Sequence, residues 1–398
     1  MANSRKTDIY LLAVSRITRS IAAGMINVAF PYYILTGLHY GAFVIGLIYV
    51  SATVATAVLG FLSGVTTDVW GKRGTLIIAS IFLPISAIMV YMSQSLWLIV
   101  PAAMLGGYSA TGSLAGGGIG GAVQPIESAI LASLTSNKER TRYFSVFTFI
   151  SGVTAALGAL LSKVFDVRDI FLAAAIISVV GIPGLWRLHV ADATGKIRRL
   201  KTKTTIGKFT LTGMLNGFSQ GLVVPFLIPF FVLVYHVPKS EMSVYAFVSG
   251  ALGSFAILGA PYLERTFGFV KSVVLTRGIG LLLFTVFPII RFLPVSVVIY
   301  ILAPSLRVAA LPIQQSELTK RVDDDEMGRA LGINQVARLV ASSTGTGLSG
   351  YLIDTALFEI PFFAYGLIMA GNLYLYIKFF GTGKGKPPES DTESLEAK

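Results

Sequence analysis

Seven ionisable side chains lie inside long apolar segments of this 398-residue sequence, where they could bind ions or move protons. They are Arg16, Arg19, Arg277, Arg307, Arg338, Glu127 and Glu317. Each such group costs at least about 2.5 kcal/mol near the centre of a membrane unless it is paired or reached by water. Because arginines outnumber glutamates, the set predicts attraction of a carboxylate or phosphate group.

Glu127 is the carboxylate that lies deeper in its segment, since Glu317 is close to a segment end. The ionisation of a buried carboxylate depends on its burial and on neighbouring arginines, and both can change when a ligand arrives. Glu127 is therefore the candidate for proton coupling.

The composition predicts a protein that crosses a membrane many times. The sequence is 54% hydrophobic and 13% charged, and a membrane-spanning helix needs about 20 apolar residues. Such segments lie at about 11–36, 43–67, 74–93, 96–135, 143–163, 169–187, 209–234, 242–263, 270–291, 295–318, 328–353 and 361–380. The expected class is an all-α membrane protein with twelve transmembrane helices.

Basic residues are distributed unevenly between the two sides of these segments. Most of the 32 Lys and Arg residues lie in the chain ends and alternate loops, whereas the opposite loops hold Lys163, Arg168, Lys239 and Arg291. Positive charge marks the cytoplasmic side, which predicts a multi-pass protein of the cytoplasmic membrane with both termini inside. The net charge of +12 then indicates contact with anionic lipid and not with nucleic acid.

The sequence lacks the residue patterns of enzymes and of metal or cofactor sites. It contains no cysteine, and its three histidines are far apart. We find no HExxH, phosphate loop or serine–histidine arrangement, and GGGIGG lacks the strand–helix context of a dinucleotide site. No catalytic residue, metal or cofactor is expected.

The two halves of the sequence resemble each other. At an offset of 197 residues Gly24 meets Gly221 and Gly71 meets Gly268, and at an offset of 187 Pro125 meets Pro312 and Gly158 meets Gly345. Repeated halves are typical of transporters that bind their substrate between them. We expect six-helix bundles at 1–186 and 209–381, a cytoplasmic linker at 187–208 and a disordered cytoplasmic tail at 382–398.

The change of offset places an insertion in the fourth segment, within the glycine-rich stretch 106–127. A continuous helix over 96–135 would be about 60 Å long, twice the hydrocarbon thickness. We therefore expect a break or outward loop in the fourth span, with helix resuming near residue 122. The alternative is a longer outer loop followed by an ordinary span. The glycines assigned to the break are Gly112, Gly116, Gly117, Gly118, Gly120 and Gly121.

The loop between the second and third segments reads GVTTDVWGKRG, with Gly64, Asp68, Gly71, Lys72 and Arg73 in the pattern G-x3-D-x2-G-[KR]-[KR]. This loop resembles the signature of the major facilitator superfamily (MFS), as do the span count, the basic linker and the duplication. The resemblance implies two pseudo-symmetric bundles and a role for this motif in closing the cytoplasmic gate. An ordinary basic loop with a capping Asp is the alternative for the motif alone.

The resemblance also ranks the polar residues, because spans one, four, seven and ten line the central path in this family. The expected cavity residues are Arg19, Asn27, Gln124, Glu127, Asn216, Gln220, Arg307, Gln314 and Arg338. Polar residues within spans can instead join helices. Arg16 and Glu317 are equally consistent with a position at the membrane surface, and Arg277 is expected to pair locally or reach that surface.

Two family signatures of proton-coupled members are absent. Pro101 and Ala102 stand where the fourth-span pattern has an arginine, and Ala159 stands where the fifth-span pattern of drug antiporters has a proline. The assignment as a drug–proton antiporter is thereby weakened.

Together these features predict a monomeric secondary transporter. It would move a small organic solute, anionic or amphipathic, by rocker-switch alternating access, with protons as a candidate coupling ion. The first alternative is an efflux pump for multiple drugs or lipid-like compounds. A membrane receptor that does not transport is a second alternative, which the short outer loops disfavour.

Overall fold

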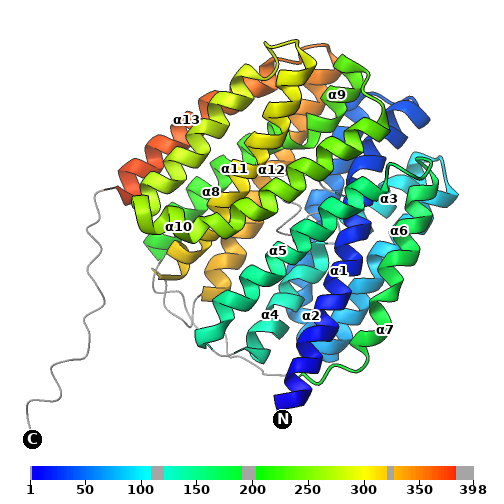
Figure 1. Ribbon diagram of the computed structural model, residues 1–398, viewed down its shortest axis with the longest axis vertical. Helices are drawn as coiled ribbons and strands as arrows, with labels where there is room; N and C mark the ends of the chain where they lie inside the picture. Colours follow the sequence, from blue (N-terminus) through cyan, green and yellow to red (C-terminus); the bar gives the residue numbers. More distant parts are fainter. Residues whose placement is uncertain (1, 109–120, 136, 191–202, 321–326, 382–398) are drawn as a thin grey trace, which may run out of the picture.

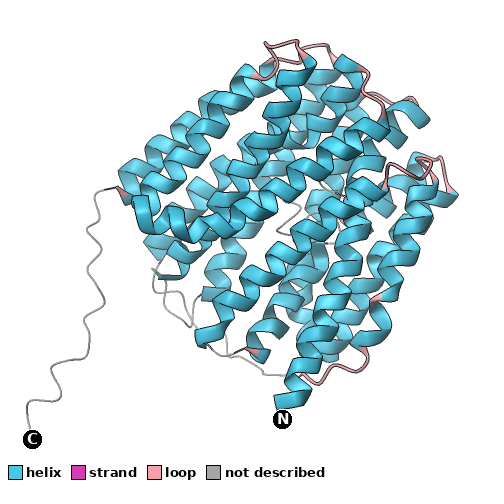
Figure 2. Cartoon of the chain, viewed as in Figure 1, coloured by secondary structure: helices cyan, strands magenta, loops and turns pink. Residues whose placement is uncertain are grey.

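The computed structural model describes residues 2–108, 121–135, 137–190, 203–320 and 327–381. Within these ranges the chain forms helices and turns and contains no strand, as Figure 2 shows. The expectation of an all-α protein is therefore confirmed for the part of the chain that the structure describes.

The helices of the first half are α1 (Ala2–Tyr32), α2 (Ala42–Met92), α3 (Leu96–Gly106), α4 (Gln124–Leu134), α5 (Asn137–Leu161), α6 (Asp169–Val180) and α7 (Ile182–Leu185). The helices of the second half are α8 (Lys203–Val223), α9 (Leu227–Tyr235), α10 (Lys239–Val286), α11 (Leu293–Lys320), α12 (Met327–Asp354) and α13 (Ile360–Phe380). Short π or 3-10 segments add η1 (Tyr33–Gly37), η2 (Gly121–Val123) and η3 (Val224–Phe226).

Two of these helices each contain two spans joined at a glycine. Gly71 interrupts α2 with φ 68° and Gly268 interrupts α10 with φ 75°. Both backbone conformations are essentially restricted to glycine, and the two positions are equivalent in the sequence repeat. Among the described residues, eight helical segments are long and apolar enough to cross a membrane, and Leu96–Gly106 and Asp169–Leu185 form shorter apolar helices. Divided at these glycines, the helices follow the twelve expected spans.

The helices pack into two bundles, which lie side by side in Figure 1. In the first bundle α1 packs against α5 and α6, and α2 packs against α3 and α6. In the second bundle α8 packs against α12 and α13, and α10 packs against α11 and α13. The expected fold of two six-helix bundles is confirmed.

Glycines permit an equivalent close helix crossing in each bundle. A methyl group added at Gly24 would overlap the carbonyl oxygen of Ala155, and one added at Gly158 would overlap that of Ile21, so α1 and α5 touch through their backbones. Gly221 and Gly345 meet the carbonyl oxygens of Ser342 and Phe218 in the same way, between α8 and α12. The sequence repeat therefore corresponds to a repeated helix contact.

The apolar core shows where the bundles are joined. We call the outer end the one that carries the connections at 38–41, 93–95, 162–168, 236–238, 287–292 and 355–359, and the inner end the opposite one. At the outer end one core contains residues of both bundles, including Tyr33, Ile45, Phe226 and Phe231. Toward the inner end the first bundle has its own core around Ile126 and the second has another around Val273.

The fourth span is interrupted. Helix α3 ends at Gly106, Gly107 adopts a left-handed conformation with φ 62°, and the backbone N–H of Tyr108 donates to the carbonyl of Ala103 at 2.9 Å. Helical structure resumes at Gly121 in η2 and continues into α4. The expected break residues Gly112, Gly116, Gly117, Gly118 and Gly120 lie outside the described residues.

We expect Gly158→Ala to lower the stability of the protein by about 1–3 kcal/mol, because overpacking a tight contact forces backbones apart. Thermal unfolding in detergent would measure this effect. Gly259→Ala is the matched control, since Gly259 also lies within a helix and nothing approaches within 4 Å of its added methyl group. Equal stability of the two variants would contradict the proposed role of the crossing.

Candidate functional site

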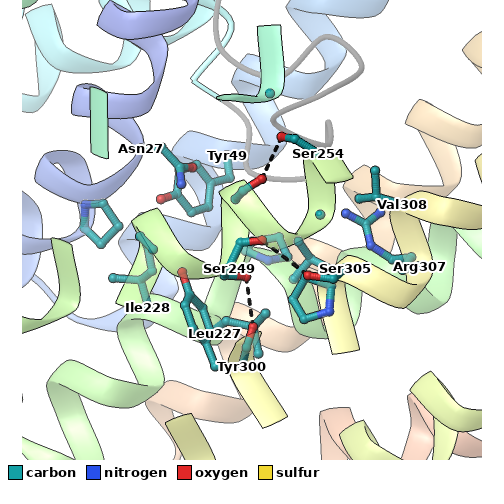
Figure 3. A pocket seen from close by; sticks show the side chains of 18 residues that line it. Asn27, Tyr49, Leu227, Ile228, Ser249, Ser254, Tyr300, Ser305, Arg307 and Val308 are labelled. Atoms are coloured by element: carbon teal, nitrogen blue, oxygen red, sulfur yellow. Dashed lines mark hydrogen bonds between the residues drawn. The ribbon is translucent and has the colours of Figure 1, made fainter. Parts of the chain in front are cut away.

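A cavity of about 790 Å³, counting its open mouth, lies between the bundles. The first bundle contributes Asn27 and Tyr49, and the second contributes Tyr300 and Arg307. Much of the remaining lining is apolar, with Leu227, Ile228 and several prolines. Figure 3 shows Arg307 at one side of the cavity and Asn27 and Tyr49 at the other. Such a cavity, mostly apolar with few polar groups, is typical of a small-molecule site.

Arg307 is the cationic group of this lining, and amides hold it in place. Its Nη1 donates to Oε1 of Gln220 at 2.8 Å, and Nε2 of Gln220 donates to Oδ1 of Asn216 at 2.8 Å. Asn216 and Gln220 are both buried on α8. Of the expected cavity residues, these two thus lie behind Arg307, while Arg307 and Asn27 line the cavity.

Serines of the cavity wall were not among the residues that sequence patterns indicated. The Ser249 hydroxyl donates to the carbonyl of Tyr300 at 3.1 Å, and the Ser305 hydroxyl donates to the carbonyl of Ser249 at 3.2 Å. These bonds join α10 to α11 beside the cavity (Figure 3). These serines donate to backbone carbonyls. Because every residue has such a carbonyl, the sequence does not indicate which one accepts the hydrogen bond.

In the first bundle, Glu127 on α4 is paired with two arginines of α1. Arg19 donates a short hydrogen bond to Oε2 of Glu127, and Nη1 of Arg16 lies 3.5 Å from Oε1. Glu127 is 1% exposed, and the Arg16 guanidinium also lies 5.9 Å from the centre of the Phe147 ring. The structure thus brings together Arg19 and Glu127, and it adds Arg16 as an ion-pair partner.

In the second bundle, Arg277, Arg307 and Arg338 are instead each hydrogen-bonded to a glutamine. Arg277 donates to Oε1 of Gln314 at 2.5 Å, and Arg338 donates to Oε1 of Gln335 at 2.7 Å. Gln314 in turn donates to the Tyr376 hydroxyl. With Arg307, these arginines have no ion pair with a carboxylate in the part of the chain that the structure describes. Gln124 is half-buried on α4, one turn before Glu127.

The motif between spans two and three is described in part. Gly71 forms the turn, and Lys72 follows it directly. The Arg73 Nη1 lies 3.4 Å from the carbonyl oxygens of both Trp186 and Leu188, just after α7. This cation therefore binds carbonyls beyond a helix C-terminus within its own bundle. Gly64 and Asp68 lie within α2, and the side chain of Asp68 is outside the described part of the structure.

Charged residues of the second bundle cap helices of the first at the outer end. Lys239 Nζ donates to the carbonyl of Ser162 at 2.7 Å and also to that of Phe165, which follow the C-terminus of α5. Asp354 Oδ1 accepts from the backbone N–H of Phe43 at 3.4 Å, at the N-terminus of α2. Each charge has the sign that its helix end favours. We call these two contacts the outer latch.

Neutral contacts accompany the outer latch. The Ser162 and Ser243 hydroxyls lie 2.8 Å apart across the bundles, and the Tyr32 hydroxyl donates to the carbonyl of Val237 at 2.7 Å. The inner halves, in contrast, have separate cores. The structure thus shows a cavity between bundles that are joined at their outer ends.

Comparison with known proteins agrees with this architecture. The family model described as Major Facilitator Superfamily matches residues 12–346. A search of the curated proteins finds no relative of this chain.

Several solved transporter structures share the fold. The human organic anion transporter MFSD10 (TETRAN) has a TM-score of 0.67 and 14% identity, over 94% of this chain and 99% of the other. The nucleoside transporter NupG has a TM-score of 0.72 and 13% identity, over 94% and 99%. The xylose transporter XylE from E. coli, in a partially occluded inward-open conformation, has a TM-score of 0.72 and 13% identity, over 97% and 100%.

We expect Lys239→Met to weaken the outer latch and shift the protein toward a state in which the outer ends separate. The chain has no cysteine, so spin labels can be attached to Gln94→Cys and Val295→Cys, at the outer connections of the two bundles. Double electron–electron resonance should then show longer distances in the Lys239→Met background.

Lys163→Met is the control for this measurement, because Lys163 is exposed and lies in the same outer region. Like Lys239→Met, the Lys163→Met substitution removes one positive charge, but it leaves the Lys239 cap of α5 in place. Distances that do not change with Lys239→Met, or that change equally with Lys163→Met, would refute the role of the latch.

Proposed function

Because the chain belongs to the Major Facilitator Superfamily, we propose that it is a secondary transporter that moves a small organic anion across the cytoplasmic membrane. The observation that carries the proposal is Arg307, a buried cation that lines the cavity between the bundles and has no carboxylate partner in the described part of the chain. A buried charge without a counter-ion is costly. An anionic substrate would supply that counter-ion.

Alternating access is the proposed mechanism. The glycine crossings of α1 with α5 and of α8 with α12 make each bundle a compact unit. The contacts between the bundles at the outer end are hydrogen bonds, helix caps and a shared apolar core. Breaking these contacts while the inner halves close would expose the cavity to the other side. The motif at Gly64, Asp68, Gly71, Lys72 and Arg73 is the proposed inner gate in that second state.

Glu127 is the proposed proton carrier. In the present state Arg16 and Arg19 stabilise its carboxylate. An arriving anion would compete with Glu127 for Arg19, and Glu127 could then take up a proton in place of its ion pair. This exchange would couple the movement of an anion to that of a proton. With a monoanion, the net charge of this group would stay the same, because one negative charge faces the two arginines before and after the exchange.

The apolar part of the cavity favours a substrate with an apolar body. Tyr49 and Tyr300 lie on opposite bundles, are almost fully buried, and expose their rings to the cavity with Leu227 and Ile228. This lining also suits the second candidate function, efflux of hydrophobic or lipid-like compounds. A neutral drug would leave Arg307 without a counter-ion, so we favour the organic anion.

The proposal includes a monomeric protein with both chain termini in the cytoplasm. The substrate and membrane lipid are its proposed partners. A thermal-shift screen of the purified protein against organic anions, sugars, amino acids and drugs tests the substrate class, because a ligand stabilises the state that it binds. Stabilisation by neutral drugs with none by anions would overturn the proposal in favour of efflux.

We expect Glu127→Gln to bind the anion found by this screen but to lose the pH dependence of its uptake. The amide keeps the size of the carboxylate and cannot exchange a proton. Uptake into proteoliposomes with and without a pH gradient, together with binding in detergent, measures the two effects separately.

Glu359→Gln is the control, since Glu359 is paired with Arg291 at the outer end, 3.0 Å away and far from Glu127 in the fold. It should retain the pH dependence of the unmodified protein. If Glu127→Gln also kept proton-driven uptake, Glu127 would not be the proton carrier.

A further inference from the structure

We propose that Arg277, Arg307 and Arg338 form a subsite in the second bundle for a doubly charged headgroup, a phosphate monoester or a pair of carboxylates. We call these residues the arginine cluster. The inference rests on the proposed transport of an organic anion. It further specifies that the substrate headgroup carries two negative charges and that the second bundle binds it.

The first observation is that two members of the arginine cluster, Arg277 and Arg307, are buried and have unused hydrogen-bond donors. Arg277 is 2% exposed and Arg307 is 6% exposed. Buried Nε and Nη1 of Arg277, and buried Nε of Arg307, have no hydrogen-bond partner in the described structure. Leaving a buried donor unsatisfied costs about 1–3 kcal/mol, and more for a charged group. These donors are therefore available to the oxygens of a ligand.

The second observation is the choice of neighbour for each arginine. Gln314 accepts from Arg277, Gln220 from Arg307 and Gln335 from Arg338. A glutamine fixes the direction of a guanidinium but does not neutralise it. A glutamate at the same place would act as a permanent counter-ion and compete with a substrate. The three amides thus hold the arginine cluster in place and leave its charge uncompensated.

The third observation is a difference in charge between the two bundles. In the first bundle Glu127 compensates one of its two arginines, which leaves one positive charge. The arginine cluster has three positive charges and no carboxylate partner in the described residues. A ligand with one negative charge would leave two positive charges of the cluster without a counter-ion. A dianion would leave one such charge, which is the number left in the first bundle.

The three arginines lie on α10, α11 and α12 of the second bundle. Arg307 and Gln314, the partner of Arg277, are two turns apart on α11, or about 10 Å. Arg307 is the member of the cluster that lines the cavity, so the proposed substrate would contact the arginine cluster first at Arg307.

Two matched pairs of probes test the charge of the headgroup on the purified full-length protein at pH 8 and constant ionic strength. Phenyl phosphate and benzenesulfonate share a ring and a tetrahedral headgroup, but they are a dianion and a monoanion. Phthalate and benzoate form the corresponding carboxylate pair. We expect the dianion of at least one pair to bind about tenfold more tightly than its monoanion, because it engages a further charge-assisted hydrogen bond. The pair that discriminates identifies the headgroup as phosphate or dicarboxylate.

Arg277→Gln and Arg307→Gln test the location of the subsite. Each should abolish the preference for the dianion. Each should also raise the melting temperature of the ligand-free protein, since it removes a buried charge that lacks a counter-ion, and this readout shows that the variant is folded. Arg291→Gln is the control, because Arg291 is exposed and paired with Glu359. It should keep the preference for the dianion.

The outcomes separate this inference from the proposed function. Equal binding of dianion and monoanion within both pairs would overturn the doubly charged subsite and leave anion transport standing. A preference that survives both Arg277→Gln and Arg307→Gln would place the dianion elsewhere and also overturn the inference. Binding of none of the four probes, with stabilisation by neutral drugs, would overturn the proposed function itself.

Discussion

Compensation of charge in a low-dielectric interior is the constraint on which the rest of this structure depends. The chain meets it in two ways. Glu127 is an internal counter-ion for Arg16 and Arg19, and glutamines hold the arginine cluster. The second way differs from the first because an amide leaves the charge uncompensated. The proposed anionic substrate would supply the missing negative charge in the second bundle.

The backbone crossings determine which parts can move. Where Gly24 and Gly158 bring α1 against α5, and where Gly221 and Gly345 bring α8 against α12, the helices touch with no side chain between them. Close packing of this kind has one arrangement and resists gradual deformation. In the proposed alternating access, movement would therefore occur at the boundary between the bundles, where hydrogen bonds and the shared outer core form the contacts.

Much of the fold could be predicted from the sequence because its determinants are local. Segment length and hydropathy indicate the spans, and the repeat relates Gly71 to Gly268, which form equivalent turns with positive φ. The interruption after Gly106 followed from the length of the fourth segment, although residues 109–120 lie outside the described structure. These features need no knowledge of which helices meet.

The partners of the charged residues could be predicted only in part. Arg16 was equally consistent with the membrane surface, because its pairing with Glu127 depends on how α1 and α4 are rotated toward each other. Local pairing of Arg277 was expected, but Gln314 and Tyr376 as its neighbours were not. The roles of Lys239, Asp354 and the cavity serines were missed, since their partners are backbone atoms that every residue has.

The atoms that form the outer latch determine which residues at this boundary can be substituted without loss of the contact. Both of its charged side chains, Lys239 and Asp354, belong to the second bundle, and their partners are main-chain carbonyl and amide groups of the first. Substitutions at Ser162, Phe165 or Phe43 would leave those backbone groups in place. The first bundle can thus vary in sequence at these backbone positions while the charged contacts persist, because their charged side chains are encoded in the second half of the gene.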